Sequence, residues 1–265
     1  MDNFLRFLFR ANKLNFTTVF VVVSCLSFPV HASPWQSSDY ILNSFNKIAL
    51  SGSQLKKWRQ PIYYQIAHHV DDIELHEKLV ALHLEQLQLY IELPILPANS
   101  EHKANMTIVL TTEEKLNSDV GYYFKLTDTN KINEITKNKI GVTSIRSNRE
   151  GYIEESVIVI PTDRARAYGR LLTSFAEMLT RGIGMQNHSN EVSPSIFNGD
   201  SVNGELTGLD SVMIKLLYDQ RIQPGMNDKG IQALGKLILN EKKYKKFINE
   251  ADVQVRQCGL NSLLN

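Results

Sequence analysis

Residues 141–184 of this chain, GVTSIRSNREGYIEESVIVIPTDRARAYGRLLTSFAEMLTRGIG, predict two strands followed by a helix. Residues 141–145 and 152–160 are rich in valine and isoleucine, which favour strands. Residues 148–151, Asn-Arg-Glu-Gly, have the composition of a turn between them. We therefore expect a hairpin here.

The helix that follows is amphipathic. We expect Thr162 or Asp163 to cap it and the helix to continue to about Ile183. Gly184 lies just past its end, where glycine commonly terminates a helix. The apolar residues expected on its buried side are Leu171, Phe175, Met178 and Leu179.

The segments before the hairpin alternate between helix and strand. The expected elements are a helix over 40–50, a strand over 61–66, a helix from Asp71 or Asp72 to about Tyr90, and a strand over 106–110. The polar segment 111–139 predicts a helical turn and a long surface excursion. Later helices are expected near 206–218, 229–239 and 241–249. This order predicts an α+β fold in which helices cover a small mixed sheet, within one domain over residues 33–265.

The first 32 residues have the pattern of a signal peptide. Three basic residues precede an apolar stretch over 16–28, and Val30-His31-Ala32 offers a cleavage point before Ser33. Val22-Val23-Ser24-Cys25 also fits a lipoprotein box, with Cys25 lipidated. We favour cleavage after about Ala32 and export to the periplasm, and keep an outer-membrane lipoprotein as the alternative.

Composition excludes several classes of function. Residues 1–32 contain three of the 29 basic and one of the 28 acidic residues, which leaves 26 and 27, a net charge of −1. A near-neutral chain has no general electrostatic attraction to nucleic acid. No second apolar run is long enough to span a membrane, so we expect a soluble mature domain. It would retain one cysteine, Cys258, which we interpret as a partly buried free thiol.

Three histidines, His69, His76 and His83, recur every seven residues, and we expect them on the helix that ends near Tyr90. Seven residues span about 10.5 Å of helix, too far for neighbouring histidines to share one ion at bonds of about 2 Å. They lie beside the predicted apolar stripe, so we interpret them as half-buried packing residues. The stripe comprises Ile73, Val80, Leu84 and Leu87.

Common catalytic motifs are absent from the sequence. It contains no His-Glu-x-x-His, no Gly-x-Ser-x-Gly and no phosphate-binding Gly-x-x-x-x-Gly-Lys. The basic run at residues 242–246 is typical of a solvated helix face. We therefore expect no cofactor.

Ordered sequence blocks between residues 164 and 226 carry a family resemblance. They are Leu179 to Met185, the Pro-Ser-Ile-Phe-Asn block that ends in Phe197 and Asn198, with Asp200, then Leu206-Thr207 with Asp210, and finally Leu217, Tyr218, Asp219, Arg221, Pro224, Gly225 and Met226. The chain resembles an uncharacterised bacterial family, domain of unknown function 2927. The resemblance implies an exported or lipoprotein-type envelope protein.

The resemblance also implies a degenerate metallopeptidase helix of the metzincin kind, His-Glu-x-x-His-x-x-Gly-x-x-His. Alignment of its glycine with Gly184 places Glu177 and Arg181 at the first two metal ligands and Asn187 at the third. Met178 then replaces the general base, and His188 lies one residue too late.

The side chains at these positions argue against a zinc site. A guanidinium stays protonated and offers no lone pair to a metal. Methionine cannot deprotonate a metal-bound water. Glu177 and Arg181 instead have the spacing of a helical ion pair, on a face away from Leu171 and Phe175. A structural pair and a relic binding cleft are both compatible with this pattern.

The family blocks also have structural interpretations. Asn198 and Asp200 favour turns, Asp219 and Arg221 form a candidate ion pair, and Pro224-Gly225 predicts a turn before the next helix.

Three functional hypotheses follow. The first is a periplasmic, non-catalytic domain with a zincin-like core that binds an envelope protein or a peptide at a strand edge. The second is an atypical zinc peptidase that uses His188, Glu177 and a distant histidine. The third is a structural envelope or surface-assembly component, with or without a lipid anchor.

Overall fold

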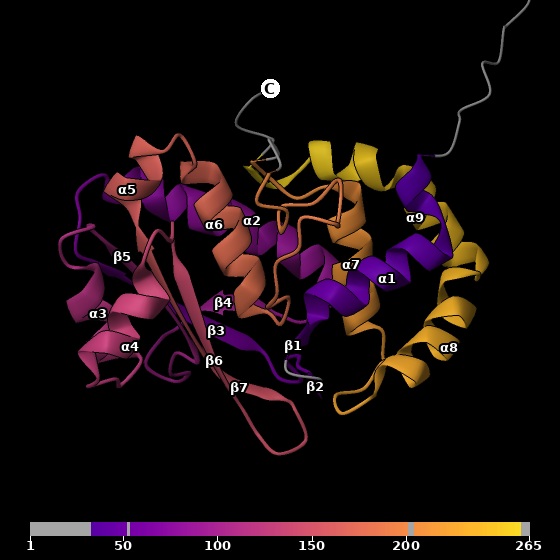
Figure 1. The fold of residues 1–265 in the computed structure, drawn as a ribbon, viewed down its shortest axis with the longest axis horizontal. Helices are drawn as coiled ribbons and strands as arrows, with labels where there is room; N and C mark the ends of the chain where they lie inside the picture. Colours follow the sequence, from indigo (N-terminus) through magenta and orange to yellow (C-terminus); the bar gives the residue numbers. More distant parts are fainter. Residues whose placement is uncertain (1–32, 52–53, 201–203, 261–265) are drawn as a thin grey trace, which may run out of the picture. The chain divides into compact units, whose positions relative to one another are not determined.

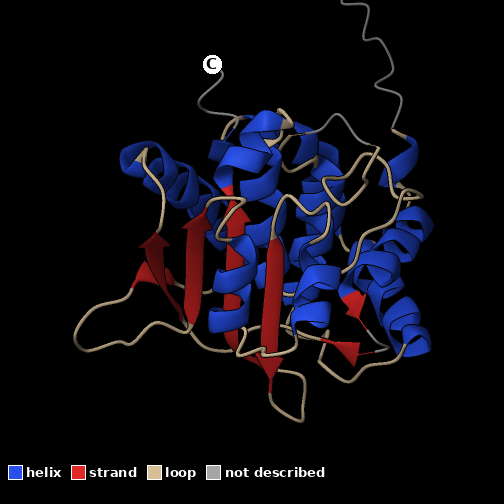
Figure 2. Ribbon diagram, turned by 60° about the vertical axis from the view of Figure 1, so that its left-hand side comes forward, coloured by secondary structure: helices blue, strands red, loops and turns tan. Residues whose placement is uncertain are grey.

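One mixed sheet of five strands organises the computed structural model, which describes residues 33–51, 54–200 and 204–260. The strand order is β4-β3-β5-β7-β6. β3, β4, β5 and β7 run parallel, whereas β6 pairs antiparallel with β7 at one edge (Figures 1 and 2). Their bounds are β3 (Ile62–His68), β4 (Ile95–Pro97), β5 (Met106–Thr111), β6 (Val142–Ser147) and β7 (Ile153–Pro161).

The central strands β5 and β7 bury both of their faces. Successive side chains of a strand point to opposite faces, so odd and even residues enter different clusters. Ile108 and Ile158 belong to the larger cluster, and Val109 and Val159 belong to the smaller one. This two-sided burial explains why these strands are continuous apolar runs.

Two helices cover the smaller cluster. They are α3 (Leu116–Tyr123) and α4 (Thr129–Thr136), which lie on the opposite side of the sheet from α2 and α6 (Figure 1). Leu116, Val120 and Ile132 are their buried apolar residues. The prediction of a long surface excursion over 111–139 was therefore wrong, because these few apolar residues suffice to cover one face of the sheet.

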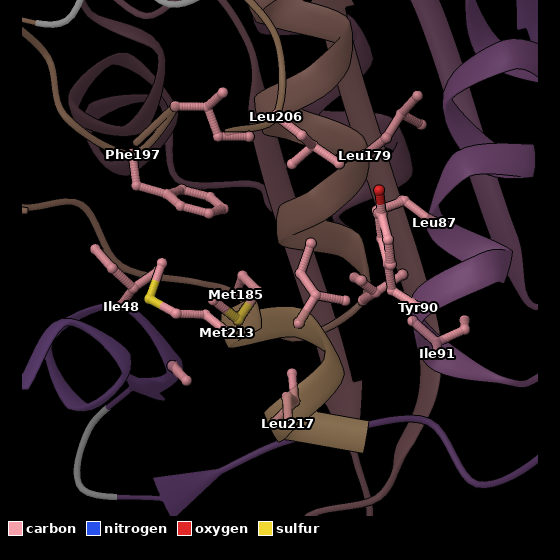
Figure 3. Close-up of a cluster of buried hydrophobic side chains, with 14 of the residues drawn as sticks. Ile48, Leu87, Tyr90, Ile91, Leu179, Met185, Phe197, Leu206, Met213 and Leu217 are labelled. Atoms are coloured by element: carbon pink, nitrogen blue, oxygen red, sulfur yellow. The ribbon is translucent and has the colours of Figure 1, made fainter. Parts of the chain in front are cut away.

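The remaining helices pack on the other face and against each other. The larger cluster contains side chains from the sheet, from α2, α6 and α7, and from the loop that includes Phe197 (Figure 3). The elements are α1 (Ser38–Ala49), α2 (Ile73–Ile91), α6 (Leu171–Gly182), α7 (Gly208–Tyr218), α8 (Asp228–Leu239) and α9 (Lys242–Arg256). Shorter elements are a 3-10 turn η1 (Pro34–Gln36) and the hairpin of β1 (Leu50–Ser51) with β2 (Gln54–Leu55). The predicted α+β class is confirmed.

The hairpin of β6 and β7 is confirmed, but the single helix predicted after it is two helices. α5 (Thr162–Ala167) ends at a turn in which Gly169 has φ 63°, and α6 follows. The backbone N–H of Arg170 donates to the carbonyl of Ala165 across this turn, at 2.8 Å. Neither Thr162 nor Asp163 caps α5, because Pro161 occupies the cap position.

The start of α2 also differs from the prediction. Asp72 occupies the N-cap position but has φ 60° and makes no side-chain capping bond. Its carboxylate instead pairs with Arg166 at 2.9 Å. Ile73, predicted on the buried stripe, is 50% exposed, whereas Val80, Leu84 and Leu87 are buried as expected.

Several predictions fall at or near the ends of the described chain. The signal peptide over residues 1–32, with Cys25, lies outside the described residues. Cys258 is a partly buried free thiol, as predicted, and donates to the carbonyl of Gln254 at 3.2 Å. Among the described helices, none combines the length and apolar character needed to cross a bilayer.

Two of the three histidines are more buried than predicted, whereas His69 is half-buried as predicted but lies before α2. His76 and His83 are each 1% exposed, and His69 is partly buried with its Nδ1 3.0 Å from Asp119. His83 Nε2 lies 2.9 Å from the hydroxyl of Thr180, which donates its own proton to the carbonyl of Ala176 at 2.6 Å. Because that hydroxyl proton is committed, His83 donates its Nε2–H to Thr180.

We expect His83 to make the fold sensitive to acid. Burial lowers the pKa of His83 to about 3. Only the unfolded chain then binds a proton there between pH 6.5 and 3, so stability is lost as pH falls through this range. Between pH 7 and pH 5 the loss from this group should be about 2 kcal/mol in the free energy of unfolding.

Urea unfolding of the protein and of His83→Leu at both pH values measures this contribution. The variant should lose less stability on acidification than the parent protein. The control His102→Leu, at an exposed histidine, should keep the parent's dependence. Equal pH dependence in the parent and His83→Leu would contradict the assignment.

Candidate functional site

A groove of about 490 Å³ runs between the edge strand β6 and helix α6. One wall comes from the start of β6 and the residues just before it, and the other from α6 and the loop that follows α6. Four of the five predicted cleft residues line the groove: Glu177, Arg181, Asn187 and His188. Gly184, the fifth, does not line it.

The predicted ion pair on α6 is formed. Both Nε and Nη2 of Arg181 donate to the same carboxylate oxygen of Glu177, at 3.1 and 2.9 Å. Glu177 is only 7% exposed, so the pair is more buried than a surface helical pair. Removal of one partner would leave a poorly solvated charge, so the pair constrains both side chains more than a surface pair would.

Arg181 also holds the loop that follows the helix. Its Nη1 donates to the carbonyl of Gln186 at 2.7 Å. The guanidinium therefore joins α6 to the floor of the groove and presents no lone pair to a metal. The second oxygen of Glu177, Oε2, makes no hydrogen bond with any described residue.

Gly184 and Asn187 fix the position of this loop. Gly184 has φ 118°, and a Cβ atom there would lie 2.2 Å from the carbonyl oxygen of Lys56. The backbone N–H of Asn187 donates to Ile48, and its side-chain amide donates to Leu50 at 2.6 Å. Close packing therefore accounts for the glycine of the peptidase-like pattern without any catalytic role.

His188 is exposed at the groove and lies against Gly199, where a Cβ atom would approach its ring carbon to 2.9 Å. Within residues 33–51, 54–200 and 204–260, no three His, Cys, Asp or Glu side chains are arranged to hold a metal ion. The distant histidine proposed as a partner of His188 and Glu177 is therefore not found among the described residues.

The opposite wall was not singled out from the sequence. Lys139 and residues 140–143 line this opposite wall. Arg170 also lines the groove, on the α6 side, where it precedes the first residue of the helix. β6 ends the sheet, so alternate backbone N–H and C=O groups face away from β7. The hydroxyl of Thr143 donates to the carbonyl of Met178 at 3.2 Å and ties this wall to α6.

Phe197 and Asn198 are buried in the loop after α6 and Asp200 is exposed, and none of these three residues lines the groove. The Phe197 ring is fully buried (Figure 3). The amide group of Asn198 donates to the carbonyls of Asn190 and Val192, and its oxygen accepts from the N–H of Asp200. The predicted turn-forming role of Asn198 and Asp200 agrees with these bonds.

Asp210 fixes the same loop to α7. It is fully buried and accepts hydrogen bonds from the Ser195 hydroxyl, the Ile196 N–H, and both the N–H and hydroxyl of Thr207. Burial raises the pKa of Asp210 to about 6, against the opposing effect of these donors. Asp210 is therefore a structural carboxylate with no open path to a ligand.

Tyr218, Asp219 and Arg221 form a second structural cluster. The Tyr218 hydroxyl donates to the carbonyl of Ile183 at 2.8 Å and accepts from the N–H of Trp58. Asp219 pairs with Arg221 at 2.9 Å, as predicted, and accepts from the hydroxyl of Tyr244. Partial burial works against ionisation of Asp219, but Arg221 and Tyr244 hold its pKa below the usual range.

The last signature residues form a turn. Gly225 has φ 81°, and Pro224 lies close to Gly151. The thioether of Met226 accepts from the N–H of Gln223 at 3.3 Å. These positions match the turn predicted before α8.

A buried lysine that the sequence did not reveal supports this cluster. The ammonium of Lys57 donates to the carbonyls of Leu217, Asp219 and Ile222. Burial lowers the pKa of Lys57 to about 8. Because its three partners come from the end of α7 and the turn after it, no local sequence pattern could identify this role.

The family comparison agrees with the blocks quoted from the sequence. A family described as protein of unknown function (DUF2927) matches residues 38–236. No curated protein and no solved structure matches the chain.

We expect Gly184→Ala to destabilise the fold by about 3 kcal/mol, because the new methyl group must displace the backbone at Lys56. The matched control is Gly169→Ala. Gly169 also has positive φ, but a Cβ atom there meets nothing within 4 Å. Its cost should be about 1 kcal/mol. Chemical denaturation measures both, and equal costs would contradict the packing role of Gly184.

Proposed function

The chain belongs to the DUF2927 family, and we propose that it is an exported envelope protein that binds an extended polypeptide segment in the groove beside β6. The observation that carries this proposal is that the outer edge of β6 pairs with no other described strand and lies along a groove. The bonds of Arg181 hold the other wall of this groove. An extended segment can add to such an edge as a further strand.

The backbone of β6 supplies the main interaction. Main-chain hydrogen bonds give affinity to an added strand, and pockets for alternate side chains give selectivity. Residues 140–143 provide the backbone, and the groove between them and α6 provides room for side chains. The free Oε2 of Glu177 is a hydrogen-bond acceptor for the bound segment.

The groove also offers positive charge. Lys139 and Arg170 line it, and neither forms an ion pair with a described residue. Arg181 is neutralised by Glu177. The charged groups at the rim therefore favour a segment that carries carboxylates near the entrance to the groove.

We interpret the groove as a metallopeptidase-like cleft without the metal chemistry. The support is the position of α6, with its glycine, beside an antiparallel edge strand. A metallopeptidase of this pattern requires an electron-pair donor where this chain has Arg181, and that side chain holds the carbonyl of Gln186. Binding without turnover is the function that these residues support.

Export is supported by the basic, apolar and small-residue order of residues 1–32. The near-neutral charge and the absence of a nucleotide-binding motif also agree with an envelope role. The partner would then be an envelope protein or peptide.

A random peptide library screened against the purified, immobilised protein tests the groove. Selected peptides should bind the parent at least tenfold more tightly than the charge-reversed variant Lys139→Glu with Arg170→Glu. The matched control Lys131→Glu with Arg149→Glu reverses two other charges on residues that do not line the groove, and should bind normally.

N-methylated versions of a selected peptide test strand addition. Only every second N–H of an added strand pairs with the edge of the sheet. Methylation of that set of alternate amides should therefore abolish binding, whereas methylation of the other set should leave binding unchanged. If methylation of both sets has no effect, or if the groove variant binds normally, strand addition at β6 is refuted. Cleavage of the selected peptides would refute the non-catalytic role.

Fractionation of cells that express the full chain tests export and the anchor. We expect the protein in the periplasm, with a mature N-terminus near Ser33 by mass spectrometry, and the same distribution for Cys25→Ala. Membrane association that is lost in Cys25→Ala would establish the lipoprotein alternative. A full-length N-terminus in the cytoplasm would refute export.

A further inference from the structure

A larger pocket, of about 930 Å³, lies at the carboxyl ends of the parallel strands. It is separate from the groove and shares no lining residue with it. His68 at the end of β3, Thr112 just after β5 and Thr162 just after β7 contribute to its wall. In open sheets with parallel strands, small molecules commonly bind at this end.

His76 is the unusual residue in this wall. It is 1% exposed and lines the pocket, yet neither ring nitrogen has a hydrogen-bond partner among the described residues. The ring stacks on Phe175, with ring centroids 5.9 Å apart. A buried polar group without a partner costs free energy, and a bound molecule that supplies one would recover it.

The side chain of His76 lies near the start of α2. Side chains of a helix lean toward its N-terminus, so a residue in the fourth helical position reaches back over the first turn. The first-turn N–H groups at this end receive no capping bond from the Asp72 side chain. The Asp72 carboxylate pairs with Arg166 instead. Uncapped N–H groups and the helix dipole favour an anion at this point.

Charged groups of both signs surround the pocket, and Lys115 is the cation available to an anion. The ammonium of Lys115 lines the pocket and forms no ion pair with any described residue. Asp163 also lines the pocket and keeps its negative charge, although its Oδ1 accepts the N–H groups of Glu113 and Arg164. Asp71 is exposed on the rim, where its charge opposes an anion.

We propose that this pocket binds a small molecule through a compact oxyanion, a phosphate or a carboxylate, held by the start of α2, His76 and Lys115. Burial and the nearby Arg166 charge lower the pKa of His76, so its imidazole is neutral and donates one N–H. A volume of 930 Å³ greatly exceeds a bare phosphate, so the anion is one end of a larger molecule.

Titration of the purified, ¹⁵N-labelled protein with inorganic phosphate tests the anion site, at constant ionic strength held with chloride. The backbone amides of residues 73–75 and the ring nitrogens of His76 should shift together and saturate. Succinate in a parallel titration distinguishes a carboxylate from a phosphate source. Saturation by either anion supports the site, and saturation by neither overturns it.

Three variants identify the groups responsible. Lys115→Gln, at an exposed residue, should weaken binding at least fivefold, and Asp71→Asn should strengthen it about twofold by removing a like charge. His76→Phe keeps an aromatic ring beside Phe175 and should abolish saturation. Unchanged affinity in Lys115→Gln, or normal saturation in a folded His76→Phe, overturns the proposal. If His76→Phe does not fold, the phosphate-dependent shifts of the His76 ring nitrogens still test the proposal. They should saturate in the parent protein and need at least fivefold more phosphate in Lys115→Gln.

Discussion

Close packing at the end of α6 is the constraint on which the rest of the structure depends. A Cβ atom at Gly182 would lie 2.9 Å from Ile158 of β7, and one at Gly184 would lie 2.2 Å from the backbone of Lys56. The helix end therefore lies directly between the sheet and the segment after β2. A side chain at Gly184 would have to displace backbone, whereas one at Gly182 would first meet the ends of side chains.

The hydrogen bonds around the end of α6 also follow from its close packing. A helix end leaves carbonyls that need partners, and burial makes unpaired carbonyls costly. The indole of Trp58 donates to Gly182 and the hydroxyl of Tyr218 donates to Ile183. The ammonium of Lys57 donates in the same way to the carbonyl of Leu217 near the end of α7. The signature around Tyr218 is thus explained by the need to satisfy buried backbone groups, and the groove is formed by residues just outside this junction.

The sequence predicted those features that arise from local patterns. The strands β3, β5, β6 and β7 follow from their apolar runs, and the Glu177–Arg181 pair follows from its spacing on the helix. The break between α5 and α6 was missed because Gly169 lies inside an otherwise helical pattern. The failed cap at Asp72 was missed because Arg166, 94 positions away, competes for its carboxylate. The pocket around His76 was missed for a related reason: its walls come from the ends of three separate strands.

The two candidate sites use different parts of the fold, and this separation bears on what each one recognises. The groove beside β6 offers backbone groups along a line, so it suits an extended chain. The pocket at the carboxyl ends of the parallel strands offers hydrogen-bond donors that converge on one point, so it suits a compact anionic group. Arg181 supports the first arrangement because its guanidinium satisfies Glu177 and the carbonyl of Gln186 together. A metal ligand at that position would leave the Gln186 carbonyl unpaired. Arg181 therefore offers no lone pair to a metal and supplies a bond that holds one wall of the groove in place.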